Sequence, residues 1–436
     1  MITDCRNIKG TVEVPLSKSM LHRHLICAYL AGRGDVSEKF SGEGMPDDVI
    51  ATARCIGALS ACGDSGEADC RESAATLRML MPLAAALGIE TRFVMGESLA
   101  ARPTDEIAEI FSGHGASAER KGNVIRVKGK LEPGEYKVPT DISSQYVSGL
   151  LMALPVTGEE CRIVTDEKPH SEPYIEMTRR VMEAFGVRTE RCDNGDSIAY
   201  IIPSGQKYVY TPECESLAEG DWTAAAIWLT ADALLGGGIE VEGLNPDSVQ
   251  GDRVITDILK KYKSIENWRS GEKTLQEKHG DKASVVSDKD ELAISLGNNP
   301  DLVPVVALRA AASSISTRLT DISALRYKES DRIENTVRIL SMLGADIHAD
   351  GDDIVIKGSG RVETLDVPRR KQTEGILPGT DEVISAAGDH RLAMMVAIAS
   401  VITERPVRIE DPGCVKKSYP EFWEDIKKLG GRVDQI

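Results

Sequence analysis

The 436-residue chain lacks the features that mark several classes of protein. Its longest apolar runs, Ala224–Leu229 and Leu392–Ile402, fall short of the roughly 18 residues that a membrane span requires. Basic residues are in deficit, 52 against 69 acidic ones, and the net charge of −17 argues against a surface that neutralises duplex phosphates. We therefore expect no membrane span and no nucleic-acid partner. Any anionic ligand must meet a local cluster of cations.

The sequence also lacks closely spaced cysteine pairs, and its first residues do not show the pattern of a signal peptide. The nine cysteines are scattered from Cys5 to Cys414 without C-x-x-C spacing, which signals neither a disulfide framework nor a zinc site. The first fifteen residues carry Asp4 early and contain no apolar stretch of the kind that a signal peptide needs. We expect reduced thiols, no metal and a cytoplasmic location.

One pattern recurs along the chain: a helix, a closing glycine, and two short strands joined by a polar turn. The clearest copy is 337–360, where Asp350–Gly351 predicts a hairpin turn, and 110–129 and 181–202 follow the same order. The last ten residues begin another copy. The closing glycines lie 71, 158 and 86 residues apart, which fits a unit of about 75 residues and about six units in the chain: Gly115, Gly186, Gly344 and Gly430.

Six predicted helices begin at clusters of small, polar or charged residues. A helix N-terminus presents free N–H groups and a partial positive charge, so such clusters can bind anions. Ser and Asp are also the preferred N-caps, and capping is the alternative for each cluster alone. Arg or Lys in four of the six favours anion binding for the set. The clusters are 17–19, 73–78, 143–145, 219–221, 328–332 and 389–391.

At these clusters the chain resembles the 3-phosphoshikimate 1-carboxyvinyltransferase family, also called the 5-enolpyruvylshikimate-3-phosphate synthases. Nine ordered stretches across more than 400 residues carry the resemblance, whereas a single tripeptide would be a weak signal. They are PLSKSMLHR (15–23), SAATLR (73–78), GESLAARP (96–103), SSQYVSGLLMALP (143–155), SEPYI (171–175), PDLVP (300–304), LRYKESDRI (325–333), DHRLAM (389–394) and DPGCVKKSYPEF (411–422).

The resemblance implies an α/β fold of two similar domains, each of three repeated helix-and-strand units, arranged as an inside-out α/β barrel. The active site is expected in the cleft between the domains. We expect the first domain to span 16–218. The second should span 219–436 and be completed by the N-terminal strand in 1–15.

The resemblance also implies a reaction in the shikimate pathway, which leads to chorismate and the aromatic amino acids. Family members transfer the enolpyruvyl group of phosphoenolpyruvate to the 5-hydroxyl of 3-phosphoshikimate and release phosphate. The chemistry needs a proton donor for carbon, a base for the hydroxyl and cations for the anionic groups. We expect no cofactor, the two small-molecule substrates as the partners, and a monomer.

The binding residues implied by the resemblance fall into two sets. Those that match 3-phosphoshikimate contacts are Lys18, Ser19, Arg23, Ser143, Ser144, Gln145, Ser171, Tyr174, Asp301 and Lys328. Those that match phosphoenolpyruvate contacts are Lys18, Ala74, Arg102, Gln145, Glu329, Arg332, His390, Arg391 and Lys417. The cations of the two sets come from both halves of the chain, so an empty cleft is expected to repel itself and to close when anionic ligands bind.

Several of these assignments leave an alternative open. The serines can be caps, and His390 can be structural. Arg78 can organise the site rather than touch a ligand. Lys416 competes with Lys417, and we prefer Lys417 because it stands three residues before Pro420, as the family spacing requires.

Asp301, Glu329 and Lys18 are the expected catalytic residues. By the resemblance, Asp301 accepts the hydroxyl proton and Glu329 donates a proton to carbon, while Lys18 either shares the proton transfer or acts only as a charge. A carboxyl that donates a proton needs a raised pKa, yet the neighbouring cations lower it. Burial would have to favour the protonated form of Glu329.

Four positions depart from common family patterns. Ala74 and Ala75 stand where many members have Gly followed by Thr or Ser, Ala324 replaces an Asn that in some members contacts the shikimate phosphate, and Met79 follows Arg78 where some members have Pro. Glyphosate-sensitive members have Gly at the position of Ala74, and naturally insensitive ones have Ala. We therefore expect poor inhibition by glyphosate.

Two other functions compete with this interpretation. The sister enzyme that acts on UDP-N-acetylglucosamine commonly carries a reactive Cys near the stretch occupied here by 101–105, but no Cys lies between Cys70 and Cys161. A catalytically silent homologue would be expected to lose Asp301, Glu329 or Lys18. All three are present.

Overall fold

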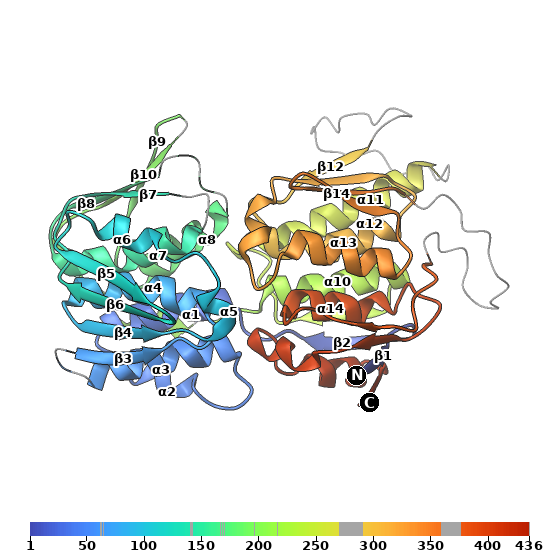
Figure 1. The fold of residues 1–436 in the computed structure, drawn as a ribbon, viewed down its shortest axis with the longest axis horizontal. Coiled ribbons are helices and arrows are strands. Elements are labelled where there is room, and N and C mark those ends of the chain that lie inside the picture. Colours follow the sequence, from blue (N-terminus) through green and yellow to red (C-terminus); the bar gives the residue numbers. More distant parts are fainter. Residues whose placement is uncertain are drawn as a thin grey trace.

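The computed structural model describes residues 1–435 apart from 62, 64, 140–142, 166, 168, 170, 196, 216, 270–290 and 359–375. Two halves lie side by side, and both ends of the chain are in the second half (Figure 1). The first half contains helices α1 (Lys18–Leu30), α2 (Val36–Lys39), α3 (Asp47–Ala61), α4 (Ala74–Leu87), α5 (Glu97–Ala100), α6 (Glu106–Phe111), α7 (Ser144–Ala153), α8 (Glu172–Ala184) and α9 (Pro212–Glu215). The second contains α10 (Trp222–Leu235), α11 (Ile255–Arg269), α12 (Val303–Ala311), α13 (Arg332–Met342), α14 (His390–Ala399) and α15 (Phe422–Lys428).

Short 3-10 helices connect several of these elements and carry part of the site. They are η1 (Leu154–Thr157), η2 (Gly251–Val254), η3 (Pro300–Leu302), η4 (Ser323–Tyr327) and η5 (Pro412–Lys417).

Four four-stranded sheets share one topology, a parallel pair followed by two antiparallel neighbours. In the first half they run β3 (Ser65–Asp69), β4 (Glu90–Val94), β6 (Val124–Gly129), β5 (Ala116–Lys121), and β7 (Glu135–Val138), β8 (Cys161–Thr165), β10 (Ile198–Ile202), β9 (Glu190–Asp193). In the second half they run β12 (Leu292–Ser295), β13 (Thr317–Thr320), β15 (Asp353–Ile356), β14 (Ile347–Asp350), and β16 (Val383–Ile384), β17 (Val407–Ile409), β1 (Ile2–Asp4), β18 (Arg432–Asp434).

The repeat predicted from the sequence is therefore present, although not six times as a full sheet. Within the described residues the four-stranded sheet occurs four times, and β2 (Gly10–Glu13) with β11 (Ile239–Glu242) forms a two-stranded parallel sheet. The turn predicted at Asp350–Gly351 is wrong by one residue. Asp350 pairs with Asp353, so the loop is Gly351–Asp352, and Gly351 takes the left-handed conformation with φ of 63° that a tight hairpin requires.

Helices fill the interior of each half, and the sheets cover them (Figure 1). All ten residues of α14 are buried, as are twelve of the fourteen in α4. A helix that is buried on all sides needs no polar face, which explains why the sequences of α4 and α14 are almost entirely apolar. Each half has its own hydrophobic core, and Cys5, Ile8, Val12 and Val14 of the N-terminal segment belong to the core of the second half.

Two chain segments connect the halves, and they hydrogen-bond to each other. The backbone N–H of Ser17 donates to the carbonyl of Glu219 at 2.8 Å, and that of Asp221 donates to the carbonyl of Pro15 at 2.9 Å. A Cβ on Gly220 would lie 2.4 Å from the carbonyl oxygen of Gly243, so only glycine permits this approach.

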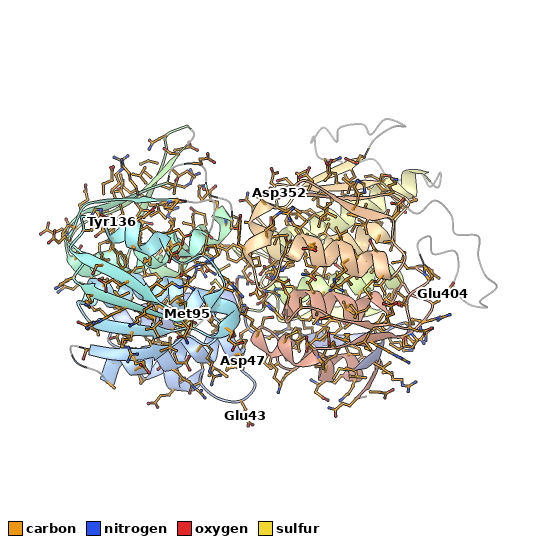
Figure 2. The ribbon with its side chains drawn as sticks, viewed as in Figure 1. Glu43, Asp47, Met95, Tyr136, Asp352 and Glu404 are labelled. Carbon is orange, nitrogen blue, oxygen red and sulfur yellow. The ribbon has the colours of Figure 1, made fainter. Side chains whose placement is uncertain are left out.

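Side chains from both halves meet along the junction. Asp47, the first residue of α3, lies beside it, whereas Tyr136 lies in the part of the first half that is far from the junction (Figure 2). Among the described residues, no helix combines the length and the apolar character that a membrane span requires.

Candidate active site

All six clusters predicted at helix starts do begin helices, namely α1, α4, α7, α10, α13 and α14. In each, a side chain caps the N-terminus by accepting a backbone N–H: Ser17, Ser73, Ser143, Asp221, Asp331 and Asp389. Capping therefore accounts for one residue of each cluster, Ser143 included. Ser19 and Ser144 lie inside the first turns, where capping does not account for them.

One cavity of about 110 Å³ between the halves collects most of the predicted residues. From the first half it is lined by Lys18, Ser19, Arg23, Ala74, Arg102, Ser143, Ser144, Gln145, Ser171 and Tyr174, and from the second by Asp301, Lys328, Glu329, Arg332 and His390. Arg391 and Lys417 do not line this cavity. Arg391 contacts Asp301 from behind, and Lys417 lines an adjoining cavity that shares Asp48 and Glu329 with the first.

The carboxylate of Glu329 lies among three cations. Its Oε1 is 3.2 Å from Nζ of Lys417 and 3.7 Å from Nη2 of Arg102, and its Oε2 accepts a 2.8 Å hydrogen bond from Nη2 of Arg332. Burial alone would raise the pKa of Glu329, but the three cations hold it well below its usual range. Glu329 is therefore an ionised carboxylate in this arrangement.

The guanidinium of Arg332 joins the two expected acid–base residues. It is 1% exposed, and its Nη1 donates to Oδ1 of Asp301 at 2.8 Å, while its Nε donates to Oδ2 of Asp389 at 2.9 Å. Nη2 of Arg391 donates to the other oxygen of Asp301 at 3.2 Å. Burial would raise the pKa of Asp301, but Arg391 and Arg332 hold it well below its usual range. Asp301 is thus an ionised carboxylate, the form that a proton acceptor needs, although the lowered pKa makes it a weak base.

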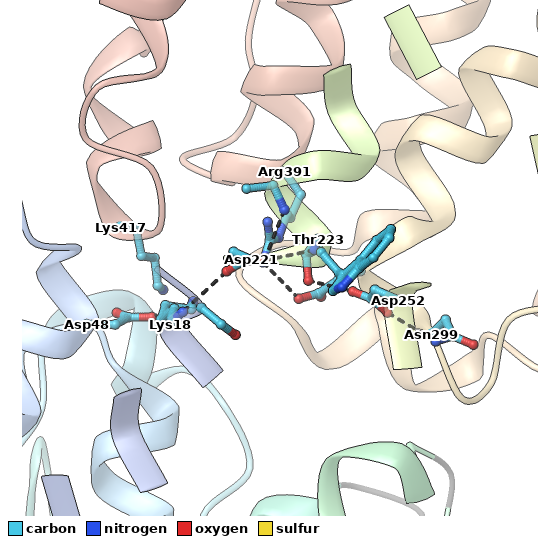
Figure 3. Close-up of polar contacts among 12 residues, drawn as sticks. Lys18, Asp48, Asp221, Thr223, Asp252, Asn299, Arg391 and Lys417 are labelled. Atoms are coloured by element: carbon cyan, nitrogen blue, oxygen red, sulfur yellow. Dashed lines mark hydrogen bonds and ion pairs between the residues drawn. The ribbon is translucent and has the colours of Figure 1, made fainter. Parts of the chain in front are cut away.

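Polar contacts cross from one half to the other beside these groups. Nζ of Lys417 donates to the carbonyl of Glu72 at 3.0 Å, and the backbone N–H of Lys18 donates to Oδ2 of Asp221 at 3.3 Å. Nζ of Lys18 also pairs with Asp48 at 2.9 Å. Figure 3 shows Lys417 pointing toward the Lys18–Asp48 pair. Carboxylates thus neutralise cations on both sides of the junction.

Several buried donors at this place have no hydrogen-bond partner among the described residues. They are Nε and Nη2 of Arg102 and Nε of Arg391. Both ring nitrogens of His390 also lack a partner, and one of them carries a hydrogen when the ring is neutral. Burial lowers the pKa of His390 well below its usual value, and the charges of Arg391 and Lys18 add to this, so the ring is neutral. Buried polar atoms are normally satisfied. An anion with several oxygen atoms would satisfy these donors.

A sequence model of EPSP synthase, described as 3-phosphoshikimate 1-carboxyvinyltransferase, matches residues 2–426 of the chain. The 3-phosphoshikimate 1-carboxyvinyltransferase of Clostridium beijerinckii is 34% identical over 98% of this chain and 97% of the relative. That of Clostridioides difficile is 32% identical over 98% and 97%. The chain belongs to the EPSP synthase family.

The solved EPSP synthase of Acinetobacter baumannii shares the fold, with a TM-score of 0.66 at 22% identity over 100% of this chain and 99% of that one. The two-domain α/β architecture expected from the sequence is confirmed. The activity of the family is the enolpyruvyl transfer between phosphoenolpyruvate and 3-phosphoshikimate.

Two arginines of this EPSP synthase family member already have protein partners. The buried guanidinium of Arg23 donates to Thr178 Oγ1 at 2.6 Å, and to the carbonyls of Ser19 at 2.7 Å and Tyr174 at 2.9 Å. It therefore holds the cavity wall together, whatever else it binds. Arg78 donates to Oε1 of Gln145 at 3.3 Å, which fits the alternative that it organises the site.

Sequence reasoning missed His22, which lines the same cavity. Its Nδ1 lies 2.7 Å from Thr52 Oγ1, Thr52 lies 2.6 Å from Thr76 Oγ1, and Thr76 donates to Ser73 Oγ at 2.8 Å. Nε2 of His22 has no hydrogen-bond partner among the described residues. The chain of hydroxyls links the cavity to the start of α4. The residues of this chain come from three separate segments, so no local sequence pattern predicts that they contact one another.

Asp48 was missed as a site residue, and Asp389, although part of the cluster 389–391, was not expected to bind Arg332. Burial would raise the pKa of Asp48, but Lys18 and Lys417 lower it below its usual value. Asp389 caps α14 and receives the Nε bond of Arg332. Asp48 lies 30 positions from Lys18 in the chain, so no sequence signal pointed to it, whereas Asp389 directly precedes the predicted residues His390 and Arg391.

Proposed function

We propose that the cavity between the halves carries out the enolpyruvyl transfer of the family, with Asp301 as proton acceptor, Glu329 as proton donor and Lys18 as an assisting cation. One observation supports this most strongly. The guanidinium of Arg332 binds both carboxylates, so a proton acceptor and a proton donor face one cavity from a single rigid support. Asp301 takes the proton of the 5-hydroxyl group of 3-phosphoshikimate, while the oxygen of that hydroxyl group attacks the enolpyruvyl carbon.

Substrate binding provides the pKa change that Glu329 needs. Lys417 and Arg102 now compensate the charge of Glu329. The phosphate and carboxylate of phosphoenolpyruvate compete for these cations, and when they take them, burial dominates and the pKa of Glu329 rises. Glu329 then takes up a proton from solvent and can transfer it to the methylene carbon. As the tetrahedral intermediate collapses, the carboxylate of Glu329 takes a proton back from that carbon, and the proton held by Asp301 leaves with phosphate.

The two substrates divide the cavity between them. The hydroxyl groups of Ser19, Ser144 and Ser171 with the ammonium of Lys328 suit the phosphate and hydroxyls of 3-phosphoshikimate, and Ser143, Gln145, Tyr174 and Arg23 complete that wall. Arg102 and His390 of the cavity suit phosphoenolpyruvate, together with Lys417 in the adjoining cavity and Arg391 behind Asp301, because their donors or charges surround Glu329 and Asp301. Ala74 lies at the wall of the same cavity.

Phosphate release tests the assignment directly. Phosphoenolpyruvate and 3-phosphoshikimate together should give phosphate and 5-enolpyruvylshikimate 3-phosphate, whereas UDP-N-acetylglucosamine in place of 3-phosphoshikimate should give none. An Asp301→Asn variant serves as the inactive control. Turnover with UDP-N-acetylglucosamine alone, or none with either acceptor, would contradict the proposal.

Four further statements belong to the same proposal. The domains divide at 16–218 and 219–436, with 1–15 completing the second, which the membership of Cys5, Ile8, Val12 and Val14 in the second core supports. The enzyme acts as a cytoplasmic monomer. It uses no cofactor. It is poorly inhibited by glyphosate.

A further inference from the structure

A buried carboxylate outside the expected site lies directly behind it. Asp252, in η2, is 3% exposed. Its Oδ2 accepts a 2.5 Å hydrogen bond from Oγ1 of Thr223, and its Oδ1 accepts a 3.1 Å bond from Nδ2 of Asn299 (Figure 3). Among the described residues, no Lys or Arg forms an ion pair with it. A buried carboxylate is usually paired with a cation, so this one requires an explanation other than an ion pair.

The two donors of Asp252 belong to the elements that carry the chemistry. Asn299 directly precedes Pro300 and Asp301 of η3. Thr223 is the second residue of α10, whose cap Asp221 accepts the backbone N–H of Lys18 at 3.3 Å. Figure 3 shows this continuous path from Lys18 through Asp221, Thr223 and Asp252 to Asn299. Asp252 is the only carboxylate along it that binds both α10 and the turn before Asp301.

We propose that Asp252 is a positioning residue for Asp301: as a carboxylate it accepts from Asn299 and Thr223 together, and this fixes the turn that aims Asp301 at the substrate hydroxyl. This inference rests on the proposed function, in which Asp301 is the base. Asp252 touches no substrate in this scheme. It acts through Asn299, and its effect reaches Asp301 through two residues of backbone.

The arrangement makes the position of Asp301 depend on pH. A protonated Asp252 would turn one acceptor oxygen into a donor, and that oxygen would then face the O–H of Thr223 or the N–H of Asn299, so one of the two bonds would be lost. Burial raises the pKa of Asp252 to about 6, and the charge of Asp301 adds to this, while the bonds from Thr223 and Asn299 and the charge of Arg391 oppose it. Tyr174 also faces this carboxylate from α8, and burial keeps its hydroxyl protonated. We therefore expect kcat to fall below about pH 6.

Variants of Thr223 test the inference without touching the site. Thr223→Val removes the hydroxyl that stabilises the carboxylate, so the acid limb of the kcat–pH profile should move upward by about 0.5 to 1 pH unit, the shift that one hydrogen bond produces. Thr223→Ser restores the donor and should restore the wild-type limb. Thr230→Val is the matched control, because Thr230 is a buried residue of the same helix whose Oγ1 has no hydrogen-bond partner among the described residues. It should leave the limb unchanged.

Asp252→Asn gives a second, independent readout. The amide has the size of the carboxyl group but cannot titrate. We expect kcat at pH 7.5 to fall at least tenfold, while KM for both substrates stays within about threefold of the wild-type values. The acid limb near pH 6 should disappear. If this variant does not fold, the Thr223 pair still decides. Identical acid limbs in wild type and Thr223→Val would overturn the inference. An inactive wild type would instead contradict the proposed function, so the two failures are distinguishable.

Discussion

Nζ of Lys417 lies 3.2 Å from Oε1 of Glu329, and the same ammonium donates to the carbonyl of Glu72 in the other half. Burial lowers the pKa of Lys417, but Glu329 and Asp48 outweigh this effect and raise it above its ordinary value. The lysine therefore stays charged. It belongs to the second half and contacts the first, so it connects closure of the cleft with the charge state of the expected proton donor.

Replacement of Lys417 should weaken the binding of phosphoenolpyruvate more than the binding of 3-phosphoshikimate. Lys417→Ala removes one cation whose side chain is only 11% exposed. We expect KM for phosphoenolpyruvate to rise at least tenfold, since hydrogen bonds to charged groups contribute about 1.5 to 3 kcal/mol. Lys416→Ala is the matched control because Lys416 is exposed and next in the chain. Steady-state kinetics, in which the concentration of each substrate is varied in turn, give the two KM values for each variant. Equal effects of the two substitutions would contradict the assignment.

Replacement of the two carboxylates should lower turnover rather than binding. Glu329→Gln and Asp301→Asn keep the size of each group and remove its proton chemistry. General acid–base groups contribute about 10² to 10⁴ in rate, so kcat should drop by at least 10² while 3-phosphoshikimate binds within about tenfold of wild type. Binding is measured by calorimetry and turnover by phosphate release. A Glu329→Gln enzyme with nearly normal kcat would remove this residue from the mechanism.

The sequence predicted the helix starts well because their signals are local. A cap residue and an apolar helix follow one another in the chain, as at Ser73 and α4, and the structure places the helix there. The hairpin at 350–353 was displaced by one residue, because choosing its central pair requires the strand register, which is set by the partner strand. The family resemblance supplied the candidate residues, but it did not supply their partners.

The charge balance of the cleft could not be read from the chain. Cations from both halves suggested that an empty cleft repels itself. That argument omitted carboxylates that the fold places among them, Asp48 beside Lys18 and Glu329 beside Arg102 and Lys417. These pairs join residues that are 30 to 227 positions apart, and only tertiary structure brings them together. The pKa of Glu329 depends on such pairs.

Close approach of the halves should depend on Gly251. A Cβ at this position would lie 2.6 Å from Cβ of Pro173 in the first half and 2.9 Å from Nδ2 of Asn299. Gly251→Ala therefore forces the two halves apart, and overpacking of this kind costs about 1 to 3 kcal/mol. We expect KM for both substrates to rise roughly five- to hundredfold.

Solution scattering should show a larger radius of gyration for the Gly251→Ala variant when both substrate sites are occupied by 3-phosphoshikimate and an unreactive phosphoenolpyruvate analogue. Gly57→Ala is the control, because Gly57 is an exposed residue of α3 with open space around its Cβ position. Unchanged KM values and scattering for Gly251→Ala would show that the contact with Pro173 does not limit closure.

His22 should make the fold sensitive to acid. Burial lowers its pKa to about 3, whereas a histidine in an unfolded chain titrates near 6.5. Between these two pH values the unfolded state binds the extra proton, so the free energy of unfolding decreases as the pH falls below about 6.5. Inside this window one such group contributes about 1.4 kcal/mol per pH unit.

The variant His22→Asn keeps a polar group near Thr52 and removes the titration. Urea unfolding between pH 4.5 and 6.5 should give a stability profile that is flatter than that of the wild type by roughly the slope of one group. His390 is also buried and remains in both proteins, so only the difference between the two profiles reports on His22. If the stability profiles of the wild type and His22→Asn were parallel, His22 would not be held neutral in the folded protein.

Ala74 should determine the response to glyphosate. It is the first residue of α4, follows the cap Ser73, is 7% exposed and lines the cavity. By the family resemblance we expect glyphosate to occupy the phosphoenolpyruvate site, and it is longer than the substrate. A methyl group on the wall of a close-packed site costs the longer ligand about 1 to 3 kcal/mol, which is roughly a five- to hundredfold loss of affinity.

The wild type should therefore be poorly inhibited by glyphosate, and Ala74→Gly should be more sensitive, with an equal or lower KM for phosphoenolpyruvate. The competing explanation is that Ala74 only improves the start of the helix. Ala74→Ser tests it, because serine keeps a side chain on the cavity wall but has a lower helix propensity than alanine. If Ala74→Ser becomes as sensitive as Ala74→Gly, the helix and not the wall is responsible. Tight competitive inhibition of the wild type, with a constant well below its KM for phosphoenolpyruvate, would refute the role of Ala74 altogether.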